Sequence, residues 1–186
     1  MTKKLKVLII LGGVLLLLGG IVLKQTVMEK GKTHSEAEEK PRMAPVQGAF
    51  APDFSLLDLS GKRVEIKEVY EQKALTILNF WATWCGPCRR EIPEFNRFYQ
   101  EYKERGLEIV AVNIGESPAQ VREFAQDEGM EFPILLDTKT EVAADYYVNA
   151  IPTTFLIDQK GLIHLVHKGT LDYNRLVRVV QEFYGK

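Results

Sequence analysis

The two cysteines of this 186-residue chain, Cys85 and Cys88, lie three positions apart in one Cys-Gly-Pro-Cys motif. The apolar run Leu75–Trp81 precedes them and contains a β-branched Thr-Ile pair, which is typical of a buried strand. The charged segment 89–105 follows them with helical spacing. We therefore expect both cysteines to lie where a core strand ends and a helix begins.

That position gives the cysteine pair a chemical role. The first turn of a helix has unpaired backbone N–H groups and the positive end of the helix dipole, so both stabilise a thiolate at Cys85. A thiolate is the attacking species in disulfide exchange and also the better leaving group. Pro87 suits the first turn, where a missing N–H costs little. We predict that Cys85 is the more exposed sulfur and that Cys88, one turn away, is buried and able to close a disulfide.

The alternative for the same pair is half of a metal site. A structural zinc site normally has four protein ligands, and only His164 and His167 could complete the set. Their spacing is short, and residues three apart on a strand point to opposite faces. A Cys-x-x-Cys motif beside a β-α-β pattern favours redox chemistry. A non-enzymatic copper or zinc chaperone that uses Cys85 and Cys88 remains an alternative.

Charge and cysteine usage narrow the function further. The 24 basic and 25 acidic side chains nearly balance, so electrostatics give no case for nucleic acid binding. Two cysteines in one motif do not form a structural disulfide framework. We expect a catalytic pair with no cofactor beyond its own redox-active disulfide.

Residues 7–23 form an uncharged apolar run behind three lysines. As a helix this run spans roughly 25 Å, at the short end for a membrane crossing. No small-x-small site follows Leu23, so we favour an uncleaved anchor over a cleaved signal peptide. Lysines flank the run on both sides, but the short basic tail 1–6 favours a cytoplasmic N-terminus. The polar segment 24–43 is then a flexible tether, and the folded domain, 44–186, lies on the extracytoplasmic side.

The rest of the chain alternates strands and helices, which indicates an α/β layer structure. A Ser-Gly-Lys turn joins the first two strands into an N-terminal hairpin, and the β-α-β order around the cysteines implies a parallel pair. A Gln-Lys-Gly turn joins the last two strands into an antiparallel hairpin. Strands are expected at 54–59, 63–66, 75–81, 107–114, 133–136, 155–158 and 162–167, and helices at 67–71, 89–105, 118–128, 141–147 and after Asp172.

The stretch Trp81–Cys88 reads Trp-Ala-Thr-Trp-Cys-Gly-Pro-Cys, and Pro93 follows five residues later. This stretch resembles the active site of thioredoxins. From about 51 to 184, the arrangement resembles the membrane-anchored thioredoxin-like oxidoreductases of the ResA/TlpA type. The resemblance implies a thioredoxin-like fold, with a central mixed sheet flanked by helices.

The resemblance also implies a substrate groove beside the cysteines. Pro152 matches the cis-proline that faces the Cys-x-x-Cys pair in this superfamily, although most X-Pro bonds are trans. Trp81 is expected in the core. We assign the groove to Trp84, Gly86, Pro87, Ile151 and Pro152.

The residues expected to transfer protons at the cysteines differ from those of thioredoxins. Thioredoxins usually carry an aspartate six residues before the first cysteine, and this chain has Asn79 there, which cannot take up a proton. ResA-type proteins carry a glutamate three residues after the second cysteine, where this chain has Glu91. Positions 88 and 91 share a helix face, so Glu91 is a candidate general base for Cys88. The alternative is a solvated helix glutamate, like Glu94 or Glu101.

The function indicated is a thiol-disulfide oxidoreductase that mainly reduces protein disulfides. The resemblance implies a transmembrane thiol reductant of the CcdA/DsbD kind as electron donor. It also implies substrates such as the haem-binding Cys-x-x-Cys of apocytochromes c, or envelope and spore proteins. Gly86 replaces the glutamate found in many ResA-type proteins, and this more thioredoxin-like motif weakens the case for any single substrate.

A thiol peroxidase of the peroxiredoxin kind is the enzymatic alternative. Peroxiredoxins place Pro and Thr seven and three residues before their peroxidatic cysteine. This chain has Leu78 and Ala82 at those positions, so the peroxidatic signature is absent.

Overall fold

The computed structural model describes residues 42–185. The predicted tail 1–6, the predicted anchor 7–23 and nearly all of the tether lie outside this range. Within the described range, no helix combines the length and the apolar character needed to cross a membrane.

A seven-stranded mixed sheet forms the centre of the described domain. Its spatial order is β2-β1-β5-β4-β3-β6-β7, with β3 parallel to β4 and antiparallel to β6. Strands β1 and β2 form the predicted hairpin, and β6 and β7 form the second one. The strands are β1 (Ser55–Asp58), β2 (Arg63–Glu65), β3 (Leu75–Trp81), β4 (Leu107–Ile114), β5 (Ile134–Asp137), β6 (Thr153–Asp158) and β7 (Ile163–Lys168).

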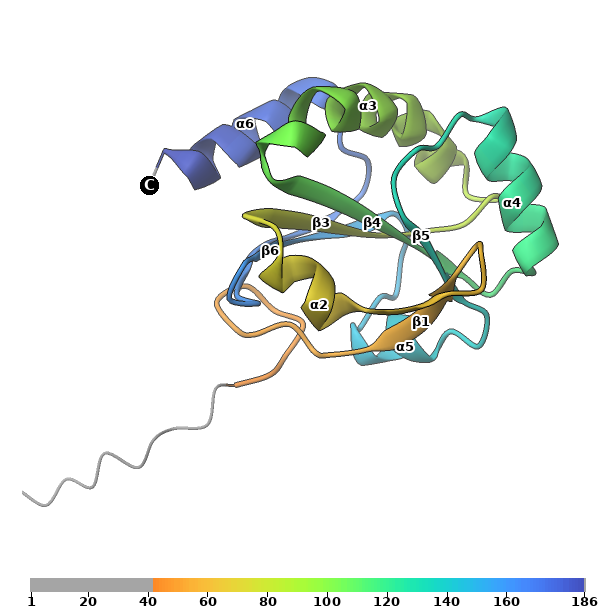
Figure 1. Ribbon diagram of the computed structural model, residues 1–186, viewed down its shortest axis with the longest axis horizontal. Helices are drawn as coiled ribbons and strands as arrows, with labels where there is room; N and C mark the ends of the chain where they lie inside the picture. The colour runs from red at the N-terminus through yellow and green to blue at the C-terminus, as the bar shows by residue number, and fades with distance from the viewer. Residues whose placement is uncertain (1–41, 186) are drawn as a thin grey trace, which may run out of the picture. The chain divides into compact units, whose positions relative to one another are not determined.

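Helices cover both faces of this sheet (Figure 1). One face packs against α3 (Gly86–Tyr102), α4 (Pro118–Asp127) and α6 (Tyr173–Tyr184), and the other packs against α2 (Ile66–Glu71) and α5 (Glu141–Asp145). Every residue of β3 is buried. A strand covered on both faces is a continuous apolar run rather than an alternating one, which explains why β3 was recognisable in the sequence.

Capping residues set the ends of the helices near the site. Asp172 caps α6, since its Oδ1 accepts a hydrogen bond from the Arg175 backbone N–H at 2.7 Å. Helix α3 begins at Gly86 with Cys85 as its N-cap, which agrees with the expectation that Pro87 lies in its first turn. The charged segment 89–105 does not remain α-helical to its end, because Lys103–Arg105 form a separate 3₁₀ turn.

Helix α5 also ends earlier than predicted, because Tyr147 adopts a left-handed backbone with φ of 51°. Its N–H donates to the Ala144 carbonyl and the Val148 N–H donates to the Ala143 carbonyl, which is a Schellman termination usually built on glycine. The Tyr147 side chain is 69% exposed. The backbone at Tyr147 is therefore strained, and little burial of its side chain compensates for the strain.

We expect Tyr147→Gly to raise the free energy of unfolding by about 0.5–1 kcal/mol, because glycine adopts this conformation without steric cost. Urea denaturation measures the change. Tyr147→Ala is the matched control, since it removes the ring but keeps Cβ. An equal gain in both variants would trace the effect to the ring and contradict the strain argument.

Candidate active site

Cys85 and Cys88 are joined by a disulfide at the N-terminus of α3, with an S–S distance of 2.10 Å. The Cys88 backbone N–H donates to Cys85 Sγ at 3.2 Å. Pro87 occupies the first turn, as predicted. Cys85 is more exposed than Cys88, but at only 4% exposure it is itself buried. The predicted order of exposure is therefore right, while the Cys85 sulfur, the expected nucleophile, is less exposed than the sequence suggested.

The residues assigned to the substrate groove lie around Cys85. The Ile151–Pro152 peptide bond is cis, and the Ile151 carbonyl oxygen lies 3.7 Å from Cys85 Sγ. Trp84 is 69% exposed, next in sequence to the buried Cys85. Gly86 and Pro87, which follow Cys85 in the sequence, are also exposed. Trp84, Gly86 and Pro87 are thus exposed next to Cys85 in the chain, whereas Ile151 is half-buried and Pro152 is buried. Trp81 lies in the core as expected.

Glu91, one helical turn after Cys88, is buried at 3% exposure and is not the solvated helix glutamate of the alternative interpretation. Its Oε1 accepts a hydrogen bond from Asn79 Nδ2 at 2.9 Å, and its Oε2 accepts one from the Leu171 backbone N–H at 3.1 Å. Asn79 Nδ2 also donates to Thr154 Oγ1 at 3.0 Å. Asn79 therefore does more than replace the aspartate that thioredoxins carry at this position, because its side chain binds the Glu91 carboxyl group.

The buried environment of Glu91 shifts the pKa of its carboxyl group toward neutral pH. Burial raises the pKa of the Glu91 carboxyl to about 7, against the opposing effect of the hydrogen bonds from Leu171 and Asn79. Both charge states are therefore populated at physiological pH. A carboxyl group with this property, one helical turn from Cys88, is suited to accept and return a proton.

We expect the free energy of unfolding to fall as pH rises. The folded carboxyl of Glu91 binds its proton more tightly than the unfolded one, whose ordinary pKa is 4.5. Its contribution is complete below that value and is lost as the pH rises through about 7, for a total of about 3 kcal/mol. Urea denaturation of the oxidised protein between about pH 5 and 8.5 measures this slope.

Glu91→Gln should flatten that pH dependence, whereas Glu101→Gln, on an exposed position of the same helix, should leave it unchanged. Equal slopes for the parent and the Glu91 variant would show that Glu91 titrates normally.

A second buried carboxylate supports the loop before Cys85. Glu116 accepts hydrogen bonds from the Thr83 backbone N–H at 2.7 Å, from the Thr83 hydroxyl and from Asn113 Nδ2 at 2.7 Å. It therefore fixes the backbone two residues before the nucleophile. Sequence analysis missed this residue. Glu116 belongs to no motif that marks it in the sequence, although the expected parallel pairing of 75–81 with 107–114 already places the turns after these two strands at the same edge of the sheet.

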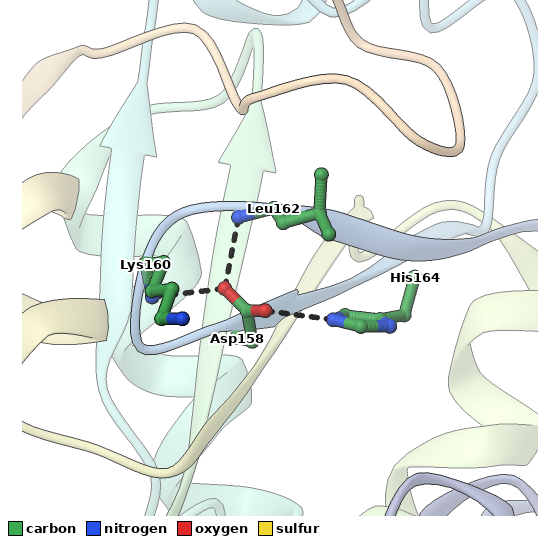
Figure 2. A network of polar contacts seen from close by, with 4 residues as sticks. All are labelled: Asp158, Lys160, Leu162 and His164. Carbon is green, nitrogen blue, oxygen red and sulfur yellow. Dashed lines mark hydrogen bonds and ion pairs between the residues drawn. The ribbon is translucent and has the colours of Figure 1, made fainter. Parts of the chain in front are cut away.

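The two described histidines have other partners. His164 Nε2 lies 2.8 Å from Asp158 Oδ2, while Asp158 Oδ1 accepts hydrogen bonds from the backbone N–H groups of Lys160 and Leu162 (Figure 2). Burial raises the pKa of Asp158, but these hydrogen bonds outweigh it and hold the pKa below its ordinary value. The ring of His167 lies against the Thr170 carbonyl. Across residues 42–185, no three His, Cys, Asp or Glu side chains are grouped to hold a metal ion.

Residues 47–166 match the AhpC/TSA family. The thiol-disulfide oxidoreductase ResA of Geobacillus kaustophilus is 44% identical over 130 residues, which cover 70% of this chain and 74% of that protein. The thioredoxin-like protein YneN of Bacillus subtilis is 41% identical over 157 residues, covering 83% and 90%.

Solved structures agree with these sequence relatives. The crystal structure of StoA from Bacillus subtilis, 31% identical, matches with a TM-score of 0.59 and covers 72% of this chain and 96% of that one. A thiol:disulfide interchange protein DsbE from Chlorobium tepidum, 32% identical, matches with a TM-score of 0.67 and covers 75% and 96%.

Proposed function

Since the chain belongs to the AhpC/TSA family and, within it, to the ResA-type thiol-disulfide oxidoreductases, we propose that it reduces protein disulfides outside the cytoplasm. The observation that carries this proposal is the Cys85–Cys88 pair at a helix N-terminus, with the Ile151 carbonyl beside Cys85 Sγ. An extended polypeptide can lie along that backbone with its own disulfide against Cys85.

The proposed reaction has two exchange steps. The Cys85 thiolate attacks one sulfur of the substrate disulfide and releases the other as a thiolate, which takes a proton from water. Cys88 then loses its proton to Glu91, attacks Cys85 Sγ and releases the substrate's second thiolate. The substrate gains two electrons, and the enzyme is left with its own disulfide. The Cys88 backbone N–H, which points at Cys85 Sγ, stabilises the thiolate in the first step.

The electrons must then be restored, and we propose a transmembrane thiol carrier of the CcdA/DsbD kind as their source. For the substrate we propose the oxidised Cys-x-x-Cys of apocytochrome c, and hence a role in cytochrome c maturation. The similarity to relatives named ResA is consistent with this choice, and envelope or spore proteins are the alternative substrates. Trp84, Gly86, Pro87, Ile151 and Pro152 form the groove that receives the peptide.

We further propose that residues 7–23 remain in the mature protein as a membrane anchor, with the catalytic domain on the extracytoplasmic side. We expect N-terminal sequencing of the mature protein to find a start at or near Met1, because no small-x-small cleavage site follows Leu23. The membrane fraction should contain the protein. A mature start beyond residue 24 would show a cleaved signal peptide instead.

Single-turnover kinetics with defined peptides test the substrate. We expect the reduced protein to reduce an oxidised Cys-x-x-Cys-His peptide, and Cys88→Ser to stop with that peptide linked to Cys85. A peptide with the same sequence but no disulfide is the control. Rapid consumption of hydrogen peroxide without peptide reduction would favour a thiol peroxidase, and tight copper or zinc binding without exchange would favour a chaperone.

A further inference from the structure

A small cavity lies between α3 and the segment that leads into α6. Its volume is about 240 Å³, and we call it the α3–α6 pocket. Thr170 and Asp172 are exposed, while Glu91 and Leu171 are buried, so the pocket wall includes both surface residues and the buried Glu91. The residues that line it are Arg90, Glu91, Glu94, Thr170, Leu171 and Asp172.

This pocket is separate from the substrate groove. None of the groove residues lines it, and neither cysteine does. Two backbone hydrogen bonds hold its inner wall in place: the Leu171 N–H, just before α6, donates to Glu91, and the Tyr173 N–H, at the start of α6, donates to Glu94 Oε2 at 3.2 Å. A polypeptide bound over Cys85 would therefore leave the pocket open.

We infer that the α3–α6 pocket is the route by which Glu91 exchanges its proton with solvent while a substrate covers Cys85. This inference rests on the proposed role of Glu91 in the reaction. In the resolving step, the S–H bond of Cys88 breaks, its proton passes to a Glu91 oxygen, and the new Cys88–Cys85 bond releases the substrate thiolate. Glu91 then gives the proton to water in the pocket. When the Cys85–Cys88 disulfide is reduced again, a proton passes from water in the pocket to Glu91 and from Glu91 to the Cys88 thiolate.

The groups around Glu91 suit such a route. Asn79 on β3 holds one carboxylate oxygen and the Leu171 N–H holds the other, so the carboxyl group is fixed rather than free to swing toward the substrate groove. Arg90, Glu94 and Asp172 are the charged side chains that line the pocket beside it. These polar groups keep the cavity suitable for water, which needs two to four hydrogen-bonding partners.

Side-chain ¹³C NMR of glutamate-labelled full chain tests the route directly. Cys88→Ser is linked through Cys85 to a peptide, so that the groove is covered, and the Glu91 signal is assigned by its loss in Glu91→Gln. We expect Glu91 to titrate with an unchanged midpoint, within about 0.3 pH unit, when the peptide is attached, because the pocket still admits water. Thr170→Trp should fill the pocket and raise the midpoint by about one pH unit, because it removes the remaining solvent from the charged form.

Asn174→Trp is the matched control, since it adds the same ring to an exposed position of α6 that does not line the pocket. If Thr170→Trp disturbs the fold, Thr170→Leu replaces it with a smaller expected shift. An unchanged midpoint in the folded Thr170 variant overturns the inference, and so does a shift on peptide attachment as large as the one caused by filling the pocket. The catalytic role of Glu91 is judged separately, by the kinetics of Glu91→Gln, so the two proposals can fail independently.

Discussion

Cys85→Ser is expected to reduce the rate of insulin disulfide reduction to the uncatalysed background. Serine keeps the size of the side chain and the N-cap of α3, but its hydroxyl does not supply the thiolate that attacks a disulfide. The turbidity of precipitating insulin chains, followed with dithiothreitol as electron donor, measures the rate. Because the cap is retained, circular dichroism and the thermal midpoint should differ little from those of the parent protein. Full activity in the folded variant would exclude Cys85 as the nucleophile.

Cys88→Ser is the matched variant for the second sulfur, and its expected result is different. The first attack by Cys85 should proceed, so a single equivalent of substrate thiol is released, and the enzyme should accumulate as a mixed disulfide. Mass spectrometry of the non-reduced protein detects this adduct. Release of both substrate thiols at the parent rate would show that Cys88 does not resolve the intermediate.

The sequence was sufficient for most of the fold, because its main elements are long and buried. Strands β3 and β4 were predicted with correct bounds, since both are buried along nearly their whole length, are rich in apolar residues and are covered by helices on either side. The pairing of β1 with β5 was not foreseen. Their register joins only Leu57 with Leu136 and Asp58 with Leu135, and two four-residue strands far apart in the chain carry no periodicity that would reveal such a contact.

Site residues that belong to a sequence motif could be predicted. A contact made by a backbone group could not, because it leaves no mark on the sequence. Cys85 and Cys88 followed from a local motif, whereas Pro152 followed only from the resemblance to thioredoxin-like proteins. The N–H of Leu171, which binds Glu91, has no side-chain signature, because any residue except proline offers the same donor. Asn79 was interpreted only as the loss of a thioredoxin carboxylate. Its role as the donor to Glu91 depends on how closely α3 packs against the sheet, which the sequence does not specify.

Glu91→Gln is expected to slow the resolution of the mixed disulfide about 10- to 100-fold at pH 8. A general base contributes about 10²–10⁴ in rate, and water can replace part of it. The parent rate should rise with pH through an inflection near 7, the pKa that burial gives Glu91, because only the charged carboxylate accepts the Cys88 proton. The variant should lack that inflection. Rapid mixing of the Cys85–peptide adduct with chemical quench measures the step, and Glu101→Gln on the exposed face of α3 is the control.

A second substitution separates the loss of a base from damage to the site. Asn79 Nδ2 and Glu91 Oε1 are 2.9 Å apart, so Asn79→Asp combined with Glu91→Gln exchanges the carboxylate and the amide between the two positions. The exchanged pair keeps one hydrogen bond and one buried negative charge, now at the position that thioredoxins use. We expect it to recover much of the rate and the pH inflection that Glu91→Gln loses. Superimposable pH profiles for the parent and Glu91→Gln would assign proton transfer to water. Failure of the exchanged pair to recover would mean that the carboxylate acts only from α3.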